Sequence, residues 1–375
     1  MKNKTLHSAT LLIGTTVGIG MFGVPFAFLK AGFFWGIFFL GLITAITLVI
    51  NLALGEVALR TRENHQIAGY AHFYLGTAWK KLVLFSFTLT VYSALLVYTV
   101  ISGEFLANIL AVTPIGFSPF TLSVVFFMVL STLVYLGLNQ ISWLELVMTI
   151  FLIVAVGVIF IGGVGSVSFD KFSFAEPSFW FLPYGVLLFA LRGFPAIPLQ
   201  REFLRGKEKY LKKSIIWGTL IPSLIFFIFA FVVVGISGEL TTPEAISGLA
   251  PFIGFPIIFI VSLFGLLAIS TSYLGLGLAL QSMFQYDFSI SKRLSWALTI
   301  FIPFLLFLAG IRNLINIMSL AGSVAIGLES IIFIFLYQKI KKKGDRIPEY
   351  SMRLPQWSWY ALILLFGAGI VYALL

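Results

Sequence analysis

Cysteine is absent from this chain of 375 residues, and charged residues make up only 10% of it. The absence of cysteine excludes disulfides and thiolate metal ligands, and it leaves the redox compartment undetermined. The three histidines, His7, His65 and His72, lie at the edges of the apolar runs or between them, so none is available in the middle of a span for metal ligation or proton relay. An enzyme of the membrane interface would need clustered histidine and carboxylate residues. The sequence has no such cluster, so we expect neither an enzyme nor an organic cofactor.

Hydrophobic residues account for 60% of the chain, far more than in a soluble globular domain. Apolar runs of about 20 residues, the length that crosses roughly 30 Å of hydrocarbon, occur eleven times. We therefore predict an all-α polytopic membrane protein that forms a single transmembrane domain over residues 1–375. The predicted spans lie at 6–28, 33–55, 82–110, 118–138, 143–164, 178–200, 214–236, 252–282, 294–311, 315–338 and 357–375.

The net charge of +10 has a topological explanation. Lysine and arginine concentrate in alternate connections between spans, as the positive-inside rule requires. We therefore predict a multi-pass protein of the inner (plasma) membrane with a cytoplasmic N-terminus and an external C-terminus. The basic stretches 201–213 and 339–353 are interpreted as topology determinants, with a lipid head-group site as the alternative. Nucleic acid is not expected as a partner, and no obligate protein partner is evident.

The first span contains five glycine or proline residues between positions 14 and 25. Such residues break helices, and in a bilayer a break frees backbone N–H and C=O groups that no water can satisfy. Irregular backbone at this depth survives where it lines a cavity or is buried in protein. The alternative is that the glycines only allow two helices to pack closely.

The sixth span is interrupted in the same way, because Gly193, Pro195 and Pro198 fall within it. Proline removes a backbone donor, so we expect the helix to open between residues 191 and 196. The first and sixth spans each begin a block of five, and an odd number of spans inverts the second block relative to the first. Broken helices at corresponding positions of inverted halves indicate a transporter site near the membrane midplane. The sequence therefore predicts a substrate site between the two breaks.

Helix ends suggest what such a site binds. Backbone N–H groups around Gly18 and Gly20 would suit a carboxylate, and freed carbonyls of both broken spans would suit an ammonium group. A zwitterionic amino acid offers both charges about one residue apart. Thr15 and Thr16 could complete the polar shell, although each hydroxyl could equally bond back to its own helix.

Charged residues inside the predicted spans are few. Arg192 lies in the break of the sixth span, where it could meet a substrate carboxylate, replace a coupling cation, or pair with Glu104 or Glu329. These two glutamates are also candidates for a gate or a proton carrier. Phe189, beside the same break, is predicted to be an aromatic gate over the substrate, unless it simply faces lipid or core like other phenylalanines.

The eighth span carries three consecutive hydroxyl residues at 270–272, and these could supply oxygen ligands to a hard cation such as sodium. Serine and threonine also commonly join membrane helices, so the motif alone is weak.

Three motifs resemble a known family. Residues 18–25 (GIGMFGVP), residues 189–193 (FALRG) with Pro198 downstream, and residues 271–278 (TSYLGLGL) are similar to the aromatic and hydroxy amino acid permeases and to the related amino acid/auxin permeases. Both belong to the amino acid-polyamine-organocation (APC) superfamily with the leucine-transporter-like (LeuT-like) fold, whose members have eleven spans in these families. The resemblance covers most of the chain.

The resemblance implies a five-plus-five inverted repeat, over approximately 6–164 and 178–338, with residues 357–375 as a peripheral eleventh helix. It also implies secondary transport by alternating access. The substrate would lie between discontinuous helices 1 and 6, which gives the predicted substrate-binding residues: Thr15, Thr16, Gly18, Ile19, Gly20, Phe189, Ala190, Leu191, Arg192 and Gly193.

In sodium-coupled members of this fold, one ion site uses two carbonyls of helix 1 and an Ala-x-x-Thr-Ser pattern in helix 8. The matching positions here are Gly14, Val17, Ala268, Thr271 and Ser272. Some proton-coupled relatives fill that site with a lysine of helix 5, and helix 5 of this chain has none. Sodium is thereby slightly favoured, whereas the similar bacterial aromatic permeases are generally regarded as proton symporters.

The function expected from the sequence is ion-coupled symport of a neutral or aromatic amino acid, with Na+ slightly favoured over H+. One alternative is an ion-independent exchanger or uniporter in which Arg192 replaces the coupling ion. A remote alternative is a structural or receptor-like membrane protein, which would not need two inverted broken helices.

Overall fold

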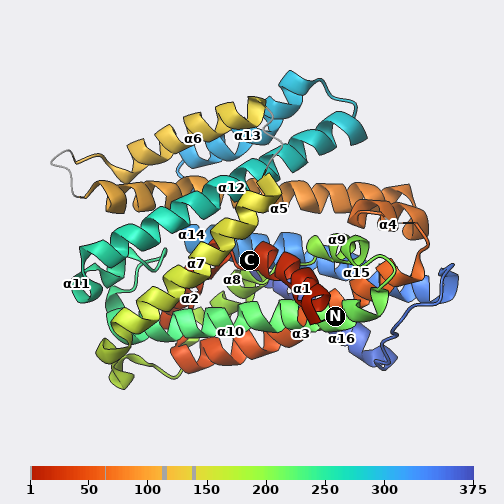
Figure 1. Ribbon diagram of the computed structural model, residues 1–375, viewed down its shortest axis with the longest axis horizontal. Helices are drawn as coiled ribbons and strands as arrows, with labels where there is room; N and C mark the ends of the chain where they lie inside the picture. The colour runs from red at the N-terminus through yellow and green to blue at the C-terminus, as the bar shows by residue number, and fades with distance from the viewer. Residues whose placement is uncertain (1, 64, 112–115, 137–140) are drawn as a thin grey trace.

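The structure is a computed structural model that describes residues 2–63, 65–111, 116–136 and 141–375. Helices are the only regular secondary structure within these ranges. Most of the long helices lie roughly side by side (Figure 1). A helix satisfies its own backbone hydrogen bonds, as a segment that crosses a bilayer must. The prediction of an all-α membrane fold is confirmed.

Each predicted span falls on one helix or on consecutive helices. Within the described residues, seven helices are long and apolar enough to cross a membrane, or eight if one bent pair forms a single span. The segments 141–163, 182–203 and 292–308 also fall on predicted spans but are not among these helices. The number of eleven spans therefore stays a prediction. The main elements are α1 (Lys2–Thr16), η1 (Ile19–Phe22), α2 (Gly23–Ala31), α3 (Phe33–Arg60), α4 (Ile67–Leu75), α5 (Thr77–Leu110), α6 (Pro119–Leu136), α7 (Ile141–Gly163), α8 (Leu182–Ala190), α9 (Ala196–Phe203), α10 (Leu211–Ser237), α11 (Ala250–Ile253), α12 (Phe255–Asp287), α13 (Lys292–Leu308), α14 (Leu314–Leu320), η8 (Ala321–Ile326), α15 (Gly327–Lys343) and α16 (Gln356–Leu374). The connections contain short 3-10 turns: η2 (Val164–Ser166), η3 (Phe169–Lys171), η4 (Pro177–Phe179), η5 (Glu208–Tyr210), η6 (Gly238–Leu240) and η7 (Ser247–Leu249).

Both predicted helix breaks are present. The first span bends by 49° between Ser8–Thr16 and Ile19–Ala31. The sixth span stops at Ala190 and resumes at Ala196. A further irregularity, not predicted from the sequence, is the π-helical segment η8, which joins α14 to α15. Such segments interrupt the regular bonding of a helix and occur frequently at functional sites.

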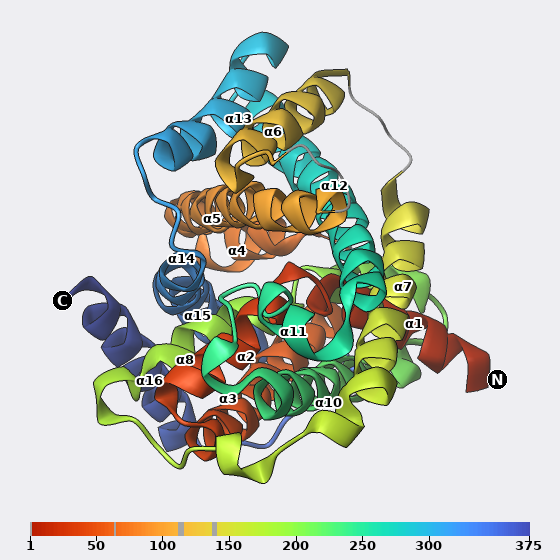
Figure 2. The same ribbon diagram turned by 90° about the vertical axis from the view of Figure 1, so that its left-hand side faces the viewer.

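The helices form two groups that meet along the broken helices (Figure 2). One group contains α1, α2, α3, α8, α9 and α10, which are the first two spans of each predicted half. The other contains α5, α6, α7, α12 and α13. This distribution is compatible with the predicted inverted repeat, whose boundaries stay a prediction. Helix α16 packs on α15, and only 17% of its most apolar stretch of 18 residues is buried, as expected of a peripheral helix.

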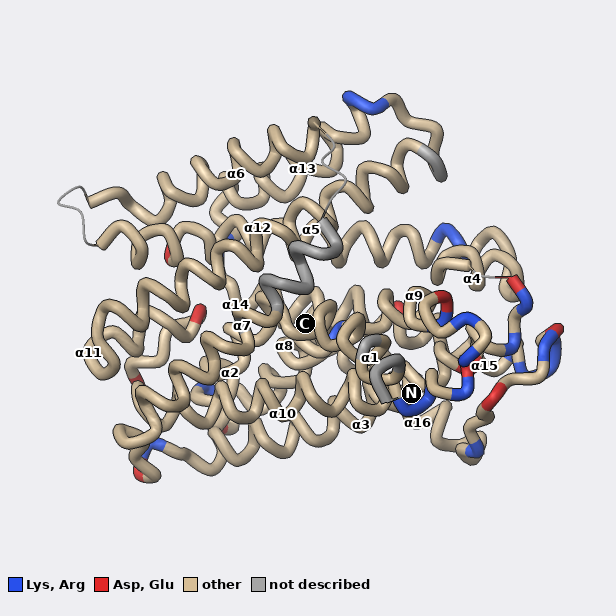
Figure 3. Tube along the Cα trace, in the orientation of Figure 1, with Lys and Arg blue, Asp and Glu red and all other residues tan. Residues whose placement is uncertain are grey.

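Lysine and arginine gather at one end of the bundle, around α4, α9 and the end of α15 (Figure 3). This separation is what the alternating charge pattern predicts. The orientation of that end toward the cytoplasm stays a prediction.

Two glycines allow α8 and η8 to touch through their backbones. A Cβ atom at Gly322 would overlap the carbonyl of Gly185, and it would lie 2.9 Å from the backbone nitrogen of Phe189. No side chain can enter this contact without moving one of the two segments. The contact fixes η8 against the half-helix that ends at the second break.

We expect Gly322→Ala to lower the free energy of unfolding by about 2 kcal/mol, because the added methyl group forces these backbones apart. Gly367→Ala on α16 is the control, since its Cβ would meet open space. The thermal midpoint of each purified variant in detergent is the measurement. Equal midpoints for the two variants would show that η8 and α8 separate at no cost.

Candidate functional site

A cavity of about 140 Å3 lies where the two broken helices meet. Its volume is roughly ten times what one water molecule needs. Residues of α1, the first break, η1, α5, α8, the second break and α12 line it: Gly14, Thr15, Thr16, Gly18, Ile19, Gly20, Thr90, Ala94, Tyr98, Phe189, Ala190, Arg192, Pro195, Ser272 and Leu276.

The first break contributes backbone to this cavity. α1 ends at Thr16, and Gly18 is extended, with φ −143° and ψ −154°, before the half-helix Ile19–Ala31 begins. The first N–H groups of a helix have no acceptor within it. Here they belong to Ile19 and Gly20, which line the cavity. The break therefore presents the positive end of a half-helix dipole to the cavity.

The two threonines of this break bond back to their own helix. The Thr15 hydroxyl lies 3.0 Å from the carbonyl oxygen of Leu12 and 3.1 Å from that of Leu11, and the Thr16 hydroxyl donates to Leu12 over 2.7 Å. Each hydroxyl oxygen keeps lone pairs that can accept a bond from a ligand. Both residues also line the cavity, so the two roles considered for them are compatible.

The second break contributes Phe189, Ala190, Arg192 and Pro195 to the lining. The two breaks touch where a Cβ at Gly20 would lie 2.6 Å from the Cα of Ala190. Two residues predicted to bind substrate lie elsewhere. Leu191 is buried in the hydrophobic core, 1% exposed, and a Cβ at Gly193 would meet Leu12 and Thr16 on α1.

Arg192 pairs with Glu329 on α15. Arg192 Nε lies 3.4 Å from Glu329 Oε2, and Arg192 Nη2 lies 3.4 Å from Oε1, with side chains 11% and 3% exposed. The guanidinium also lies over the rings of Phe194 and Phe87, at 5.0 and 5.9 Å. Arg192 is the one formally charged residue in the described lining. Its pairing with Glu329 leaves the cavity with no net charge.

The residues predicted to bind sodium are only partly together. Gly14 and Ser272 both line the cavity, whereas Val17, Ala268 and Thr271 are buried outside its lining. The Thr271 hydroxyl donates to the Ala268 carbonyl over 2.9 Å, which leaves its oxygen lone pairs free for a cation. The donor set is uncharged oxygen, which suits a hard monovalent ion. No group of three or more histidine, aspartate or glutamate residues that could hold a metal occurs in the described part of the chain.

Glu104 lies half-buried on α5, away from the cavity lining. The structure therefore separates the two glutamates considered as partners of Arg192, because Glu329 contacts the arginine directly.

Helix α5 supplies lining residues that the sequence reasoning missed. Thr90, Ala94 and Tyr98 follow one another at intervals of four, so they share one face of an unbroken helix. Leu276, one turn after Ser272 on α12, is a further lining residue that was not predicted. The spacing was visible in the sequence, but nothing local distinguished this face from the other apolar faces of long helices.

These features define the class of the protein. Two interrupted helices around a polar cavity, in a bundle of apolar helices, are the arrangement of secondary transporters. The fold is similar to that of MhsT, solved in complex with L-phenylalanine, with a TM-score of 0.61 and 17% identity over 98% of this chain and 97% of that one. The chain therefore has a LeuT-like fold.

A family model described as the tryptophan/tyrosine permease family matches residues 1–374. The chain belongs to this family, as the three sequence motifs predicted. It is 24% identical to glutamine transporter 2 of Aliivibrio fischeri, over 92% of this chain and 91% of that protein. It is also 25% identical to tyrosine-specific transport system 1 of Haemophilus influenzae, over 81% and 80% of the two chains. It is thus a multi-span membrane protein of an amino acid transporter family.

We expect Glu329→Gln to lower the free energy of unfolding by about 3 kcal/mol, because it leaves the buried guanidinium of Arg192 without a counter-charge. The double variant Arg192→Gln/Glu329→Gln should recover part of the loss. Thermal midpoints of the parent, both single variants and the double variant give the coupling energy of the pair. Additive effects would contradict the pairing.

Proposed function

We propose that the chain is a secondary active transporter that carries a neutral or aromatic amino acid, coupled to a cation, by alternating access. The observation that carries the proposal is the cavity between the two breaks, whose one charged lining residue, Arg192, is neutralised by Glu329. A site without net charge favours a zwitterion over an acidic or basic substrate, because an unpaired charge is costly away from water.

Recognition of the amino acid backbone is assigned to the first break. The N–H groups of Ile19 and Gly20, at a half-helix N-terminus, would bind the carboxylate. Backbone carbonyls near Gly14 and the threonine oxygens would accept from the ammonium group. This division uses backbone groups that are free only because the helix is interrupted.

The substrate side chain would meet the apolar and aromatic part of the lining. Ala94, Tyr98, Phe189 and Leu276 supply this surface from α5, α8 and α12. Tyr98 and Phe189 are buried, at 7% and 9% exposed. Phe189 is the proposed aromatic gate. The names of relatives that transport glutamine and tyrosine support a neutral substrate that is polar or aromatic.

For the coupling ion we favour sodium, held by carbonyls of Gly14 and Val17 and by Ala268, Thr271 and Ser272. The uncharged oxygens of Thr271 and Ser272 and the position of Gly14 and Ser272 on one cavity support this choice. A proton carried by Glu329 or Glu104 is the alternative. The pairing of Glu329 with Arg192 argues against Glu329 as the carrier, because protonation would leave the arginine unpaired.

The proposed location is the inner membrane, with the basic end of the bundle in the cytoplasm.

We expect a neutral or aromatic L-amino acid to raise the thermal midpoint of the purified protein, since a ligand at about 100 times its Kd stabilises by about 2.7 kcal/mol. The corresponding amino acid amide should have no effect, because it lacks the carboxylate that the N–H groups bind. Gly20→Leu should abolish the shift, as its side chain would enter the backbone of Ala190. Gly41→Leu, at an exposed position of α3 with open space, is the matched control. A shift with the amide equal to that with the amino acid would refute the carboxylate site.

We expect Thr271→Ala to remove the stimulation of uptake by an inward sodium gradient in proteoliposomes, because it deletes one oxygen ligand. Ser270→Ala is the control, since the Ser270 hydroxyl bonds back to Leu266 over 2.7 Å and is outside the proposed ion site. Unchanged sodium stimulation in Thr271→Ala would rule out the site. An uptake rate that does not depend on the sodium or pH gradient but requires substrate inside the proteoliposomes would instead identify an exchanger.

A further inference from the structure

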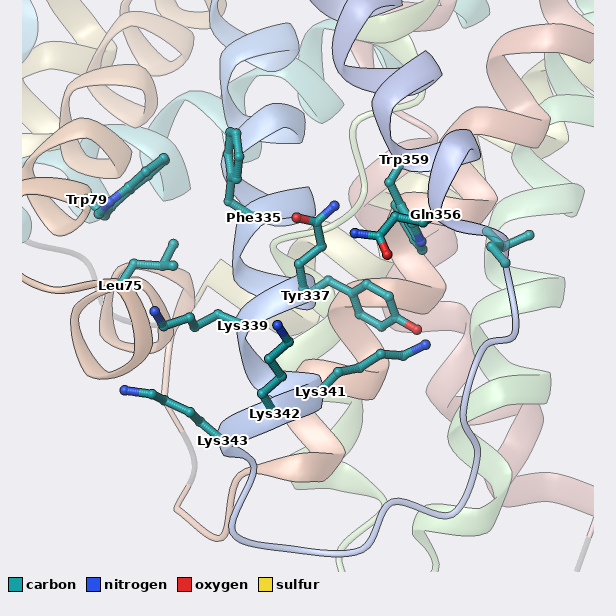
Figure 4. Close-up of a pocket in the computed structure, with 12 residues that line it drawn as sticks. Leu75, Trp79, Phe335, Tyr337, Lys339, Lys341, Lys342, Lys343, Gln356 and Trp359 are labelled. Atoms are coloured by element: carbon teal, nitrogen blue, oxygen red, sulfur yellow. The ribbon is translucent and has the colours of Figure 1, made fainter.

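A groove of about 670 Å3 lies at the basic end of the bundle, away from the cavity between the breaks. It follows the outer face of α15 from the corner between α4 and α5 to the start of α16 (Figure 4). Its lining combines cations with apolar and aromatic side chains: Leu75, Trp79, Phe335, Tyr337, Gln338, Lys339, Lys341, Lys342, Lys343, Leu354, Gln356 and Trp359. The proposed transport reaction uses none of these residues.

Three of the four lysines share one face of α15. Lys339, Lys342 and Lys343 stand at positions i, i+3 and i+4, which are neighbours on a helix surface. Figure 4 shows Lys339 and Lys343 extending to the side of α15 on which Leu75 lies. Lys341 turns to the other side, where it lies over the Tyr337 ring at 4.9 Å and donates to the carbonyl of Met352 over 2.9 Å.

The three lysines of this face have no carboxylate within 4 Å in the described part of the chain. All three side chains are exposed. Their ammonium groups repel one another, so an anion between them lowers the electrostatic free energy of the whole face. Gln338 adds a side-chain nitrogen that lacks a hydrogen-bond partner in the described structure.

The wall of the groove is aromatic. Trp79 packs on Phe335 with ring centroids 5.3 Å apart, and Tyr337 packs on Trp359 at 4.7 Å. Phe335 remains 36% exposed. Tryptophan and tyrosine concentrate at the level of lipid head groups, where one end of the ring is apolar and the other is wet.

The groove is held in shape by bonds to Glu56 on α3. This buried carboxylate accepts from the backbone N–H of Met352 over 2.6 Å and from the Ser351 hydroxyl over 2.8 Å. These bonds fix the linker between α15 and α16, which forms one side of the groove. A ligand would therefore meet a preformed surface, which reduces the entropy lost on binding.

We propose that this groove binds an anionic phospholipid, with its phosphate between Lys339, Lys342 and Lys343 and its acyl chains along Trp79 and Phe335. The charge of the lysine face requires an anion, and the adjoining apolar wall requires a ligand that is also hydrophobic. A free phosphate would satisfy only the first requirement. Basic pockets between helices at the cytoplasmic side of a membrane bind lipids of this kind.

The test uses the full-length protein purified in detergent, with phosphatidylglycerol, phosphatidylcholine or inorganic phosphate added. We expect phosphatidylglycerol to raise the thermal midpoint more than phosphatidylcholine does, and inorganic phosphate to have no effect. Native mass spectrometry of the same samples should show phosphatidylglycerol retained on the protein. An equal response to the two lipids, or a shift with phosphate alone, would overturn the proposal.

The variant Lys339→Gln/Lys342→Gln/Lys343→Gln should weaken phosphatidylglycerol binding about tenfold or more, because it removes the three unpaired charges. A matched control is Lys207→Gln/Lys212→Gln/Lys213→Gln, which removes three exposed lysines from the same end, outside the groove. We expect the control to retain phosphatidylglycerol as the parent does. An equal loss of phosphatidylglycerol binding in the two triple variants would show that the lipid is attracted by the overall positive charge of this end and not by a specific site.

Discussion

Two interrupted helices meet at a point where only glycine fits, and the rest of the architecture depends on this contact. A Cβ at Gly20 would lie 2.6 Å from the Cα of Ala190, so the breaks approach each other through backbone. In a bilayer, backbone groups outside a regular helix have to find partners within the protein or a ligand. Each break is therefore buried against the other, and the backbone of both breaks lines the cavity between them.

The second constraint is electrostatic. A guanidinium at this depth needs a counter-charge, and Glu329 supplies it from α15 at 3.4 Å. The pair neutralises the cavity and also ties the second break to α15, directly after the π-helical segment η8. The same helix carries the unpaired lysines of the groove at its other end. The helix α15 thus connects the cavity between the breaks with the surface proposed to bind lipid.

Much of this fold could be predicted from the sequence, because the relevant signals are local. Long apolar runs specify helices, and glycine and proline break a helix wherever they occur. The bend after Thr16 and the gap between Ala190 and Ala196 were accordingly predicted close to where they lie. The η8 segment was not predicted. A helix break is indicated by glycine and proline, whereas no such pattern distinguishes a π-helical turn from an α-helical one.

The sequence by itself determined the class of protein, the two breaks and most of the backbone around the cavity. Only the tertiary structure selected Glu329 over Glu104 as the partner of Arg192, because 137 residues separate the pair along the chain. It also added Tyr98 and its neighbours on α5, and it removed Leu191 from the lining. The physical reason is that the residues at a helix break themselves cause the break. The face that an unbroken helix turns to a cavity depends instead on how that helix packs against the other helices.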